Sequence, residues 1–188
     1  MRHSSSLLFH FPPAHDRCRG LSLYELIIAV AVVSALSVGT ASLHGFVARQ
    51  RIAAHTNQLL GDLHLARSEA IKRNAPVTVC KSRTGLDCTP ESSWREGWIV
   101  FVDADLNYSV AAAEPVIRVQ QAIANATVDF RGSSPHHLHY NSMGVSDNGT
   151  FTLCDTTDNS HPRFVALYRG KARVSDSEIR DGTLLTCP

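Results

Sequence analysis

Charged side chains are absent from one long segment of this 188-residue sequence. No Asp, Glu, Lys or Arg occurs from Leu26 to about Ala48. At 1.5 Å per helical residue, roughly 22 apolar residues match a hydrocarbon core of about 30 Å. The run is longer than the roughly 7–15 residues of a signal-peptide core, and we expect it to remain in the mature chain as a membrane-spanning helix.

Proline is absent between Pro13 and Pro76. Without a helix breaker, the helix is expected to continue from the membrane to about Lys72, and residues 49–75 form its amphipathic half. The polar face is either solvated or a surface for neighbouring subunits or lipid head groups. Its apolar positions are Ile52, Leu59, Leu63, Ala66 and Ala70, and its charged positions are Arg49, Arg51, Asp62, Arg67, Glu69, Lys72 and Arg73.

Two common catalytic or metal-binding signatures are also missing, because the chain has no Cys-x-x-Cys pair and no Gly-x-Ser-x-Gly motif. Their absence argues against a zinc site and against a membrane-anchored hydrolase. His137 and His139 would share one strand face, but two histidines without a carboxylate are usually surface residues. We therefore expect a protein that is not an enzyme and that has no cofactor and no metal site.

One acidic residue, Glu25, stands at the start of the apolar run, five positions after Gly20. A charge at the edge of a membrane span is costly and usually has a partner. The segment 19–26, RGLSLYEL, resembles the class III signal of type IV pilins and pseudopilins. An ordinary signal anchor, in which Glu25 is only an interfacial charge, is the alternative.

The resemblance implies how the N-terminus is processed. A prepilin peptidase would cut after Gly20, remove the leader 1–20 and methylate the new N-terminal Leu21, where the family usually has Phe or Met. Glu25 would pair with the N-terminal amine of a neighbouring subunit in the filament. The leader's excess of arginine places this end in the cytoplasm, so residues 21–48 would span the inner membrane.

After Pro76 the pattern changes to short β-branched runs separated by turn residues, which is typical of an antiparallel β domain over 76–188. The predicted fold class is thus α+β, and it is pilin-like: a long N-terminal helix is packed on a C-terminal antiparallel sheet domain. The predicted strands are Val77–Ser82, Trp98–Asp103, Val116–Gln120, Thr127–Arg131, His137–Tyr140, Thr150–Cys154, Arg163–Tyr168 and Ala172–Val174.

Removal of the leader, and of Cys18 with it, leaves four cysteines, Cys80, Cys88, Cys154 and Cys187. In an oxidising periplasm an even number of cysteines suggests two disulfides, with three possible connectivities. A short Cys80–Cys88 loop and a long Cys154–Cys187 loop form the most economical pairing. The second would fasten the C-terminal tail to a strand.

The segment 97–107, GWIVFVDADLN, indicates a particular class among the type IV pilins and pseudopilins. A Gly-Trp pair, an apolar strand and Asp-x-Asp-x-Asn are similar to the hallmark of the GspH/FimT class of minor pilins and pseudopilins. The apolar residues alternate along a strand expected to be buried on both faces. The spacing of Asp103, Asp105 and Asn107 would also suit the start of a calcium loop. Tyr108, however, stands where an EF-hand has glycine, and no glutamate is assigned to the twelfth position of the loop, so turn chemistry is favoured.

Basic residues are concentrated near the C-terminus rather than spread over the chain. Without the leader's three basic residues and one acid, the totals of 18 and 17 become 15 basic and 16 acidic residues. A generic polyanion binder would be more basic. Residues 163–173, however, contain Arg163, Arg169, Lys171 and Arg173 and no acid.

Within this cluster, Gly170, Lys171 and Arg173 resemble the Gly-Arg-x-Arg motif by which FimT-type minor pilins bind DNA. Gly170 would supply a turn, and Lys171 and Arg173 would project to one side and reach phosphates, with Arg169 as support. Lysine in place of arginine keeps the positive charge but lacks the planar guanidinium that can donate two parallel hydrogen bonds to a phosphate. A solvated hairpin with ordinary basic residues is the alternative.

The preferred interpretation is a minor pilin of a type IV pilus that binds double-stranded DNA for natural transformation. It would be a single-pass inner-membrane protein with a periplasmic C-terminal domain, and its partners would be other pilin subunits, prepilin peptidase and DNA. The alternative is an H-type pseudopilin of a type II secretion system that acts structurally.

Overall fold

The computed structural model describes residues 22–157, 161–175 and 187, without the side chains of residues 35–44. Gly20 and Leu21 lie outside the described residues. The chain divides into two compact units, Met1–Ala41 and Ser42–Pro188, and helix α1 (Leu23–Arg73) contributes to both. Among the described residues, no helix has both the length and the apolar character needed to cross a membrane.

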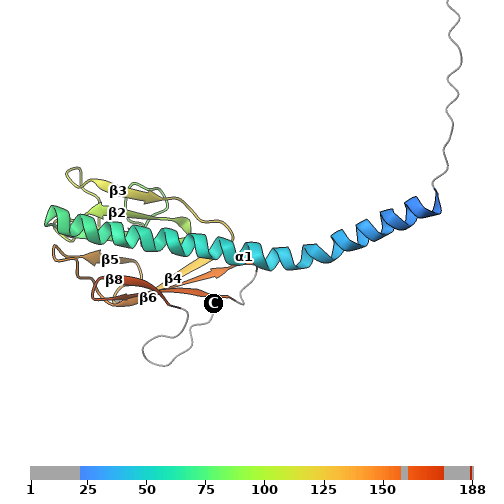
Figure 1. Ribbon diagram of the computed structural model, residues 1–188. Coiled ribbons are helices and arrows are strands. Elements are labelled where there is room, and N and C mark those ends of the chain that lie inside the picture. Colours follow the sequence, from blue (N-terminus) through green and yellow to red (C-terminus); the bar gives the residue numbers. More distant parts are fainter. Residues whose placement is uncertain (1–21, 158–160, 176–186, 188) are drawn as a thin grey trace, which may run out of the picture. The chain divides into compact units, whose positions relative to one another are not determined.

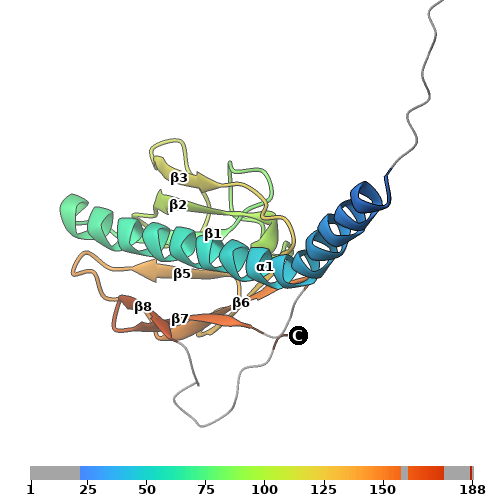
Figure 2. The ribbon, with the colours of Figure 1, turned by 45° about the vertical axis from the view of Figure 1, so that its right-hand side comes forward.

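The second unit contains two antiparallel sheets of four strands each. Sheet A has the order β3-β2-β1-β5 and sheet B the order β4-β6-β7-β8. In both ribbon views, β2 and β3 lie on one side of α1, and β6 and β8 lie on the other (Figures 1 and 2). The strands are β1 (Val77–Lys81), β2 (Trp98–Val102), β3 (Val116–Gln120), β4 (Ala126–Gly132), β5 (His137–Tyr140), β6 (Gly149–Asp155), β7 (Arg163–Tyr168) and β8 (Lys171–Ser175).

All eight predicted strands are present, and the α+β pilin-like class is confirmed. Boundaries differ by one or two residues: β4 and β6 are longer than expected, and β8 starts at Lys171 rather than Ala172. A short 3₁₀ helix that was not predicted, η1 (Trp94–Glu96), places Trp94 in the core.

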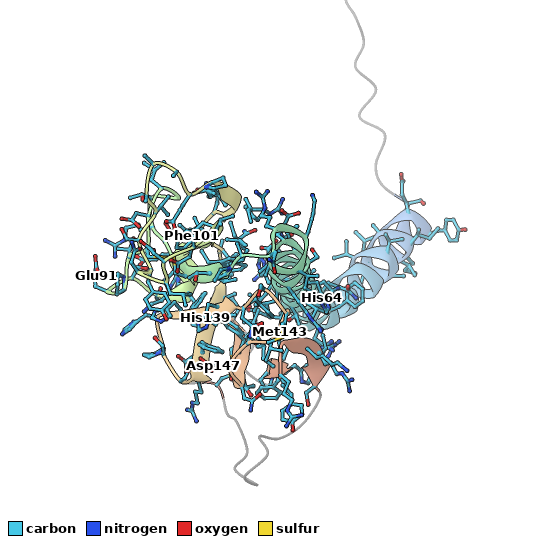
Figure 3. All side chains as sticks on the ribbon, turned by 90° about the vertical axis from the view of Figure 1, so that its left-hand side faces the viewer. His64, Glu91, Phe101, His139, Met143 and Asp147 are labelled. Carbon is cyan, nitrogen blue, oxygen red and sulfur yellow. A yellow bond between two sulfur atoms is a disulfide. The ribbon has the colours of Figure 1, made fainter. Side chains whose placement is uncertain are left out.

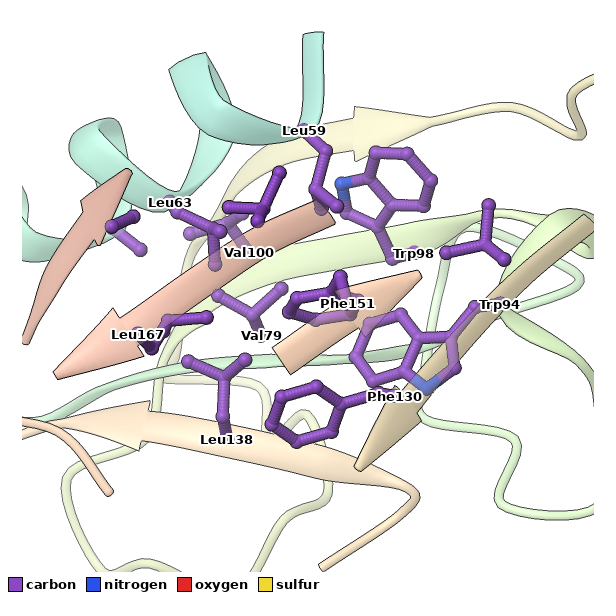
Figure 4. Packing of buried hydrophobic residues seen from close by; sticks show 14 of the residues in the cluster. Leu59, Leu63, Val79, Trp94, Trp98, Val100, Phe130, Leu138, Phe151 and Leu167 are labelled. Carbon is purple, nitrogen blue, oxygen red and sulfur yellow. The ribbon is translucent and has the colours of Figure 1, made fainter. Parts of the chain in front are cut away.

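One hydrophobic core joins α1 to the inner faces of both sheets. The helix contributes Leu59 and Leu63, both fully buried. Aromatic rings fill the space between the sheets: Trp94 packs edge-on against Phe151, with ring centroids 5.0 Å apart, and Phe130 stacks on Phe151 at 4.3 Å (Figure 4). The helix and the sheets therefore bury their apolar faces against each other.

The strand after Gly97 is buried on both faces, as its sequence predicted. Trp98 and Val100 face the main core, whereas Ile99 and Phe101 face a second, smaller cluster with Cys80. This second cluster lies under the loops before β2 and after it, because Cys88, Val110 and Val116 pack against it.

Both disulfides of the economical pairing are present. Cys80–Cys88 closes the loop that follows β1, and Cys154–Cys187 ties the end of the chain to β6. Cys154 alternates with the core residues Phe151 and Leu153 along β6, so its disulfide lies at the outer face of sheet B.

Asp62 was expected on a polar helix face that is either solvated or a surface for neighbouring subunits or lipid head groups, and the structure places it in neither setting. It is 3% exposed. Its carboxylate accepts a hydrogen bond of 3.0 Å from the indole N–H of Trp98, and Arg118 of β3 lies 3.3 Å away. Burial raises the pKa of Asp62 more than the Trp98 hydrogen bond and the Arg118 charge lower it. The periodicity of the helix could not reveal that a tryptophan from β2 would cover this position.

We expect Asp62→Ala to be less stable than Asp62→Asn by about 1–3 kcal/mol, because alanine leaves the buried N–H of Trp98 without an acceptor. Urea unfolding of the Ser42–Pro188 unit, followed by tryptophan fluorescence, measures the difference. Equal stability of the two variants would contradict the role assigned to this hydrogen bond.

The difference in stability between the wild type and Asp62→Asn should depend on pH in a defined direction. Because the pKa of Asp62 is raised in the folded state, the folded protein takes up a proton more readily than the unfolded chain. The free energy of unfolding of the wild type, minus that of Asp62→Asn, should therefore increase as the pH falls from 7 to about 4. Asp129→Asn, at an exposed position on β4, is the control.

Candidate nucleic-acid interface

The basic C-terminal motif lies at the turn of the β7–β8 hairpin. Tyr168 pairs with Lys171, so Arg169 and Gly170 are the only two loop residues. Both have positive φ, 48° and 78°, as tight hairpin turns that match the strand twist require. The unusual backbone of Arg169 is held by a 2.9 Å hydrogen bond from its N–H to the Asn148 side chain, and its guanidinium lies over the Tyr168 ring at 5.6 Å.

Gly170 is needed for close packing as well as for its φ angle. A Cβ atom at this position would lie 2.1 Å from the carbonyl oxygen of Gly144. At Gly144, in turn, a Cβ would lie 2.6 Å from Ile71 Cδ1 and 3.1 Å from Arg67 Nε, both on α1. Met143 of the same turn is labelled near the helix in Figure 3. The tip of the hairpin therefore packs on the turn that contains Gly144, and this turn packs on α1.

Lys171 and Arg173 project from the same face of β8. Both are exposed, whereas Ala172 between them is 5% exposed and belongs to the core. The two cations therefore lie on the outer face of sheet B, at the spacing of alternate strand residues, which is about 7 Å.

The structure adds one cation that the sequence analysis missed. In the register of sheet B, Arg173 pairs with Ala166, Ala166 with Thr150, and Thr150 with Arg131 of β4. Arg131 therefore lies in the same transverse row of the outer face, although it is 42 positions from Arg173 in the sequence. Strand alternation could place Arg131 on one face of β4, but only the strand order and register bring that face into line with β8.

The cations of the cluster differ in their surroundings. Arg163 pairs in register with the core residue Leu153 and so lies toward the opposite face from Arg173. Arg131 Nε lies 3.8 Å from a carboxylate oxygen of Asp129. Among the described residues, Arg169, Lys171 and Arg173 form no ion pair with an acidic side chain. A polyanion could therefore bind these three cations without displacing an acidic side chain among the described residues.

The histidines of β5 have a structural partner. His137 and His139 share one strand face, as predicted, because Leu138 and Tyr140 between and beside them are buried. The His137 ring stacks on Tyr108 with centroids 3.7 Å apart. Burial, followed by the neighbouring histidines, lowers the pKa of His137. This ring therefore supports the loop that contains Tyr108.

Glu25, the residue expected to act in assembly, lies in the first turn of α1. Its backbone N–H donates a 3.3 Å hydrogen bond to the Ser22 hydroxyl, which caps the helix. The described apolar side chains from Leu23 to Val33 are all exposed, several of them by more than half. In this unit the helix thus presents a carboxylate and an apolar surface.

Comparisons with known proteins agree with this architecture. The family model for the type II transport protein GspH matches residues 55–170. No curated protein sequence matches the chain. Two crystal forms of the type IV minor pilin FimU of Pseudomonas aeruginosa are similar in structure: one has a TM-score of 0.54 at 19% identity, covering 69% of this chain and 92% of FimU, and the other 0.51 at 18%, covering 65% and 91%.

The minor pseudopilin EpsH of the type 2 secretion system of Vibrio cholerae aligns with a TM-score of 0.49 at 13% identity, covering 67% of this chain and 97% of EpsH. The family match spans well over half of the sequence. The chain therefore belongs to the GspH family, whose members are non-enzymatic pilin-type subunits, made as inner-membrane prepilins, that assemble with other pilins.

Proposed function

We propose that this chain is a minor pilin of a type IV pilus whose β7–β8 hairpin binds extracellular double-stranded DNA, without sequence preference, for uptake in natural transformation. The observation that carries the proposal is the placement of Lys171 and Arg173 side by side on the exposed face of β8, without an acidic partner among the described residues. Cations in this arrangement contact phosphates rather than base edges.

The packing of the hairpin supports this role. Gly170 cannot accept a side chain against Gly144, so the turn is held in one conformation relative to α1. Close packing at the turn reduces the backbone ordering that phosphate binding by Lys171 and Arg173 would require, which favours affinity. Arg169 at the tip and Arg131 in the same row would extend the contact along the backbone of the duplex.

A second candidate function, an H-type pseudopilin that acts structurally in a type II secretion pseudopilus, is favoured by the charges that follow β8. Residues 176–181, which follow the hairpin in the sequence and lie outside the described residues, contain three acids, Asp176, Glu178 and Asp181, against one basic residue, Arg180. A neighbouring acidic segment would weaken the attraction of the hairpin for DNA. The mobility-shift experiment below separates the two candidates.

The N-terminal half is proposed to serve assembly in either case. The leader 1–20 is removed after Gly20, and Leu21 is methylated. Residues 21–48 lie in the inner membrane. Residues 49–75 continue the helix into the periplasm, where they precede the β-rich domain 76–188. Glu25 pairs with the N-terminal amine of a neighbouring subunit. The exposed carboxylate in the first turn of α1 and the exposed apolar side chains after it support this proposal.

The Ser42–Pro188 unit, oxidised, should shift duplex DNAs of unrelated sequence in a gel, and the shift should weaken at higher salt. Lys171→Gln/Arg173→Gln should reduce the affinity and lower the slope of log K against log salt by about 2, since each phosphate contact contributes about 0.9. Arg83→Gln/Arg95→Gln removes the same charge from exposed positions before β2 and is the matched control. No shift even at low salt, or an equal loss in the control, would favour the structural pseudopilin.

When the full chain is expressed with a prepilin peptidase, intact-mass spectrometry should find a product that begins at Leu21 and carries one added methyl group. Without the peptidase, the leader should remain. Glu25→Gln should be processed normally but be lost from sheared filaments, because the amine of the neighbouring subunit has no carboxylate partner. Glu91→Gln, at an exposed position in the β domain, should behave like the wild type in both assays. Normal incorporation of Glu25→Gln would rule out the assembly role.

A further inference from the structure

Three carboxylates converge at the loop that joins β2 to β3. Asp103, Asp105 and Glu114 each offer an oxygen, and these three oxygens lie within 4.8 Å of one another. Asp103 is fully buried at the end of β2, Glu114 is 9% exposed, and Asp105 is exposed. The group is thus open to solvent on one side and enclosed on the other.

One oxygen of this group lacks a hydrogen-bond donor. Asp103 Oδ2 accepts a 2.7 Å hydrogen bond from the Thr78 hydroxyl. Asp103 Oδ1 is buried and has no hydrogen-bond partner among the residues that the structure describes. A buried carboxylate oxygen without a partner is strongly unfavourable, and a bound cation is one way to satisfy it.

The negative charge of the group is also uncompensated. Within the described part of the chain, none of these three carboxylates forms an ion pair with lysine or arginine. Like charges at this separation repel each other, and the repulsion is larger where one of them is buried. A cation between them would convert the repulsion into attraction.

The order of the ligands along the loop fits a calcium-binding sequence. Counted from Asp103, Asp105 is third, Asn107 fifth and Glu114 twelfth. Calcium loops of the EF-hand type take ligands from the first, third, fifth and twelfth positions and need a sharp turn at the sixth. The interpretation of this segment as a simple turn overlooked Glu114, which lies beyond the Asp-x-Asp-x-Asn motif.

Tyr108 at the sixth position is not an obstacle. Its φ is 60°, in the left-handed region where an EF-hand has glycine. The stacking of its ring on His137 holds this conformation. The loop differs from an EF-hand in its surroundings, because strands β2 and β3 flank it instead of helices.

Hydrogen bonds orient the carboxylates but leave lone-pair sites on their oxygens available. Glu114 accepts the N–H groups of Ala104 at 2.8 Å and Ala111 at 3.2 Å, and Asp105 accepts the Asn107 amide at 2.8 Å. A carboxylate has about four lone-pair sites, so each group retains sites for a metal.

We propose that Asp103, Asp105 and Glu114 bind one calcium ion in the β2–β3 loop. Calcium takes six to eight oxygens at about 2.3–2.6 Å, so oxygens on opposite sides of the ion are about 5 Å apart, which accommodates the 4.8 Å grouping. Water supplies the remaining oxygens, because the amide oxygen of Asn107 accepts a 2.8 Å hydrogen bond from the Ser109 N–H. The dissociation constant expected for an extracellular module of this kind is about 10⁻⁴–10⁻³ M.

The ion would hold together the layer that covers the second core. Asp87, in the Cys80–Cys88 loop, accepts the N–H of Val110 at 2.9 Å, and Val110 packs on the second cluster. Calcium would therefore order the β2–β3 loop and, through Asp87, the disulfide loop beside it. This role is independent of the hairpin and of DNA binding.

The test uses the processed full chain in a non-ionic detergent, treated with chelator and dialysed. Isothermal titration with calcium chloride should give one ion per chain, and the unfolding temperature should rise saturably with calcium. Magnesium should bind more weakly, because it requires near-ideal octahedral geometry and loses its water reluctantly.

Asp105→Asn removes one ligand charge at an exposed position, so the variant should fold, and its calcium affinity should fall by about tenfold or more. Asp129→Asn, an exposed acid on β4, should bind calcium like the wild type. No saturable calcium binding by the wild type, an equal response to magnesium, or equal affinities of Asp105→Asn and Asp129→Asn would overturn the proposal.

Discussion

The hydrogen bond between the buried indole N–H of Trp98 and the carboxylate of Asp62 fixes how helix and sheet meet. Apolar packing is tolerant of small sliding movements, whereas a buried donor has one acceptor and is costly without it. Once Trp98 is placed against α1, β2 lies at the centre of sheet A, and β1 and β3 follow by pairing. The Phe130, Phe151 and Trp94 rings of the main core then close against the same helix.

The sequence allowed the elements to be predicted because their patterns are local. The proline-free helix, the eight strands and the two-sided burial of β2 depend on residues near one another in the chain. Contacts that depend on the assembled sheets could not be predicted in this way. Asp62 lies on the polar face of an amphipathic pattern and is nevertheless buried, because a distant tryptophan covers it.

The candidate sites show the same limit. Lys171 and Arg173 are two positions apart, so strand alternation was enough to place them on one face. Arg131 joins them only through the strand order β4-β6-β7-β8. Glu114 was available from the spacing alone, but the loop gave no reason to favour it until the buried, unpartnered oxygen of Asp103 and the positive φ of Tyr108 were known. The two sites belong to different sheets, so a substitution in one need not disturb the other.

The glycine contact at the hairpin tip has a mechanical consequence. Gly170 packs on Gly144, and Gly144 packs on the side chains of Ile71 and Arg67, so compressive load on the tip passes through two glycines to side chains of α1. Where one glycine backbone packs on another, as at Gly170 and Gly144, no side-chain torsion lies between them to absorb displacement. A force applied at the tip of the hairpin would therefore reach α1 with little deformation of sheet B.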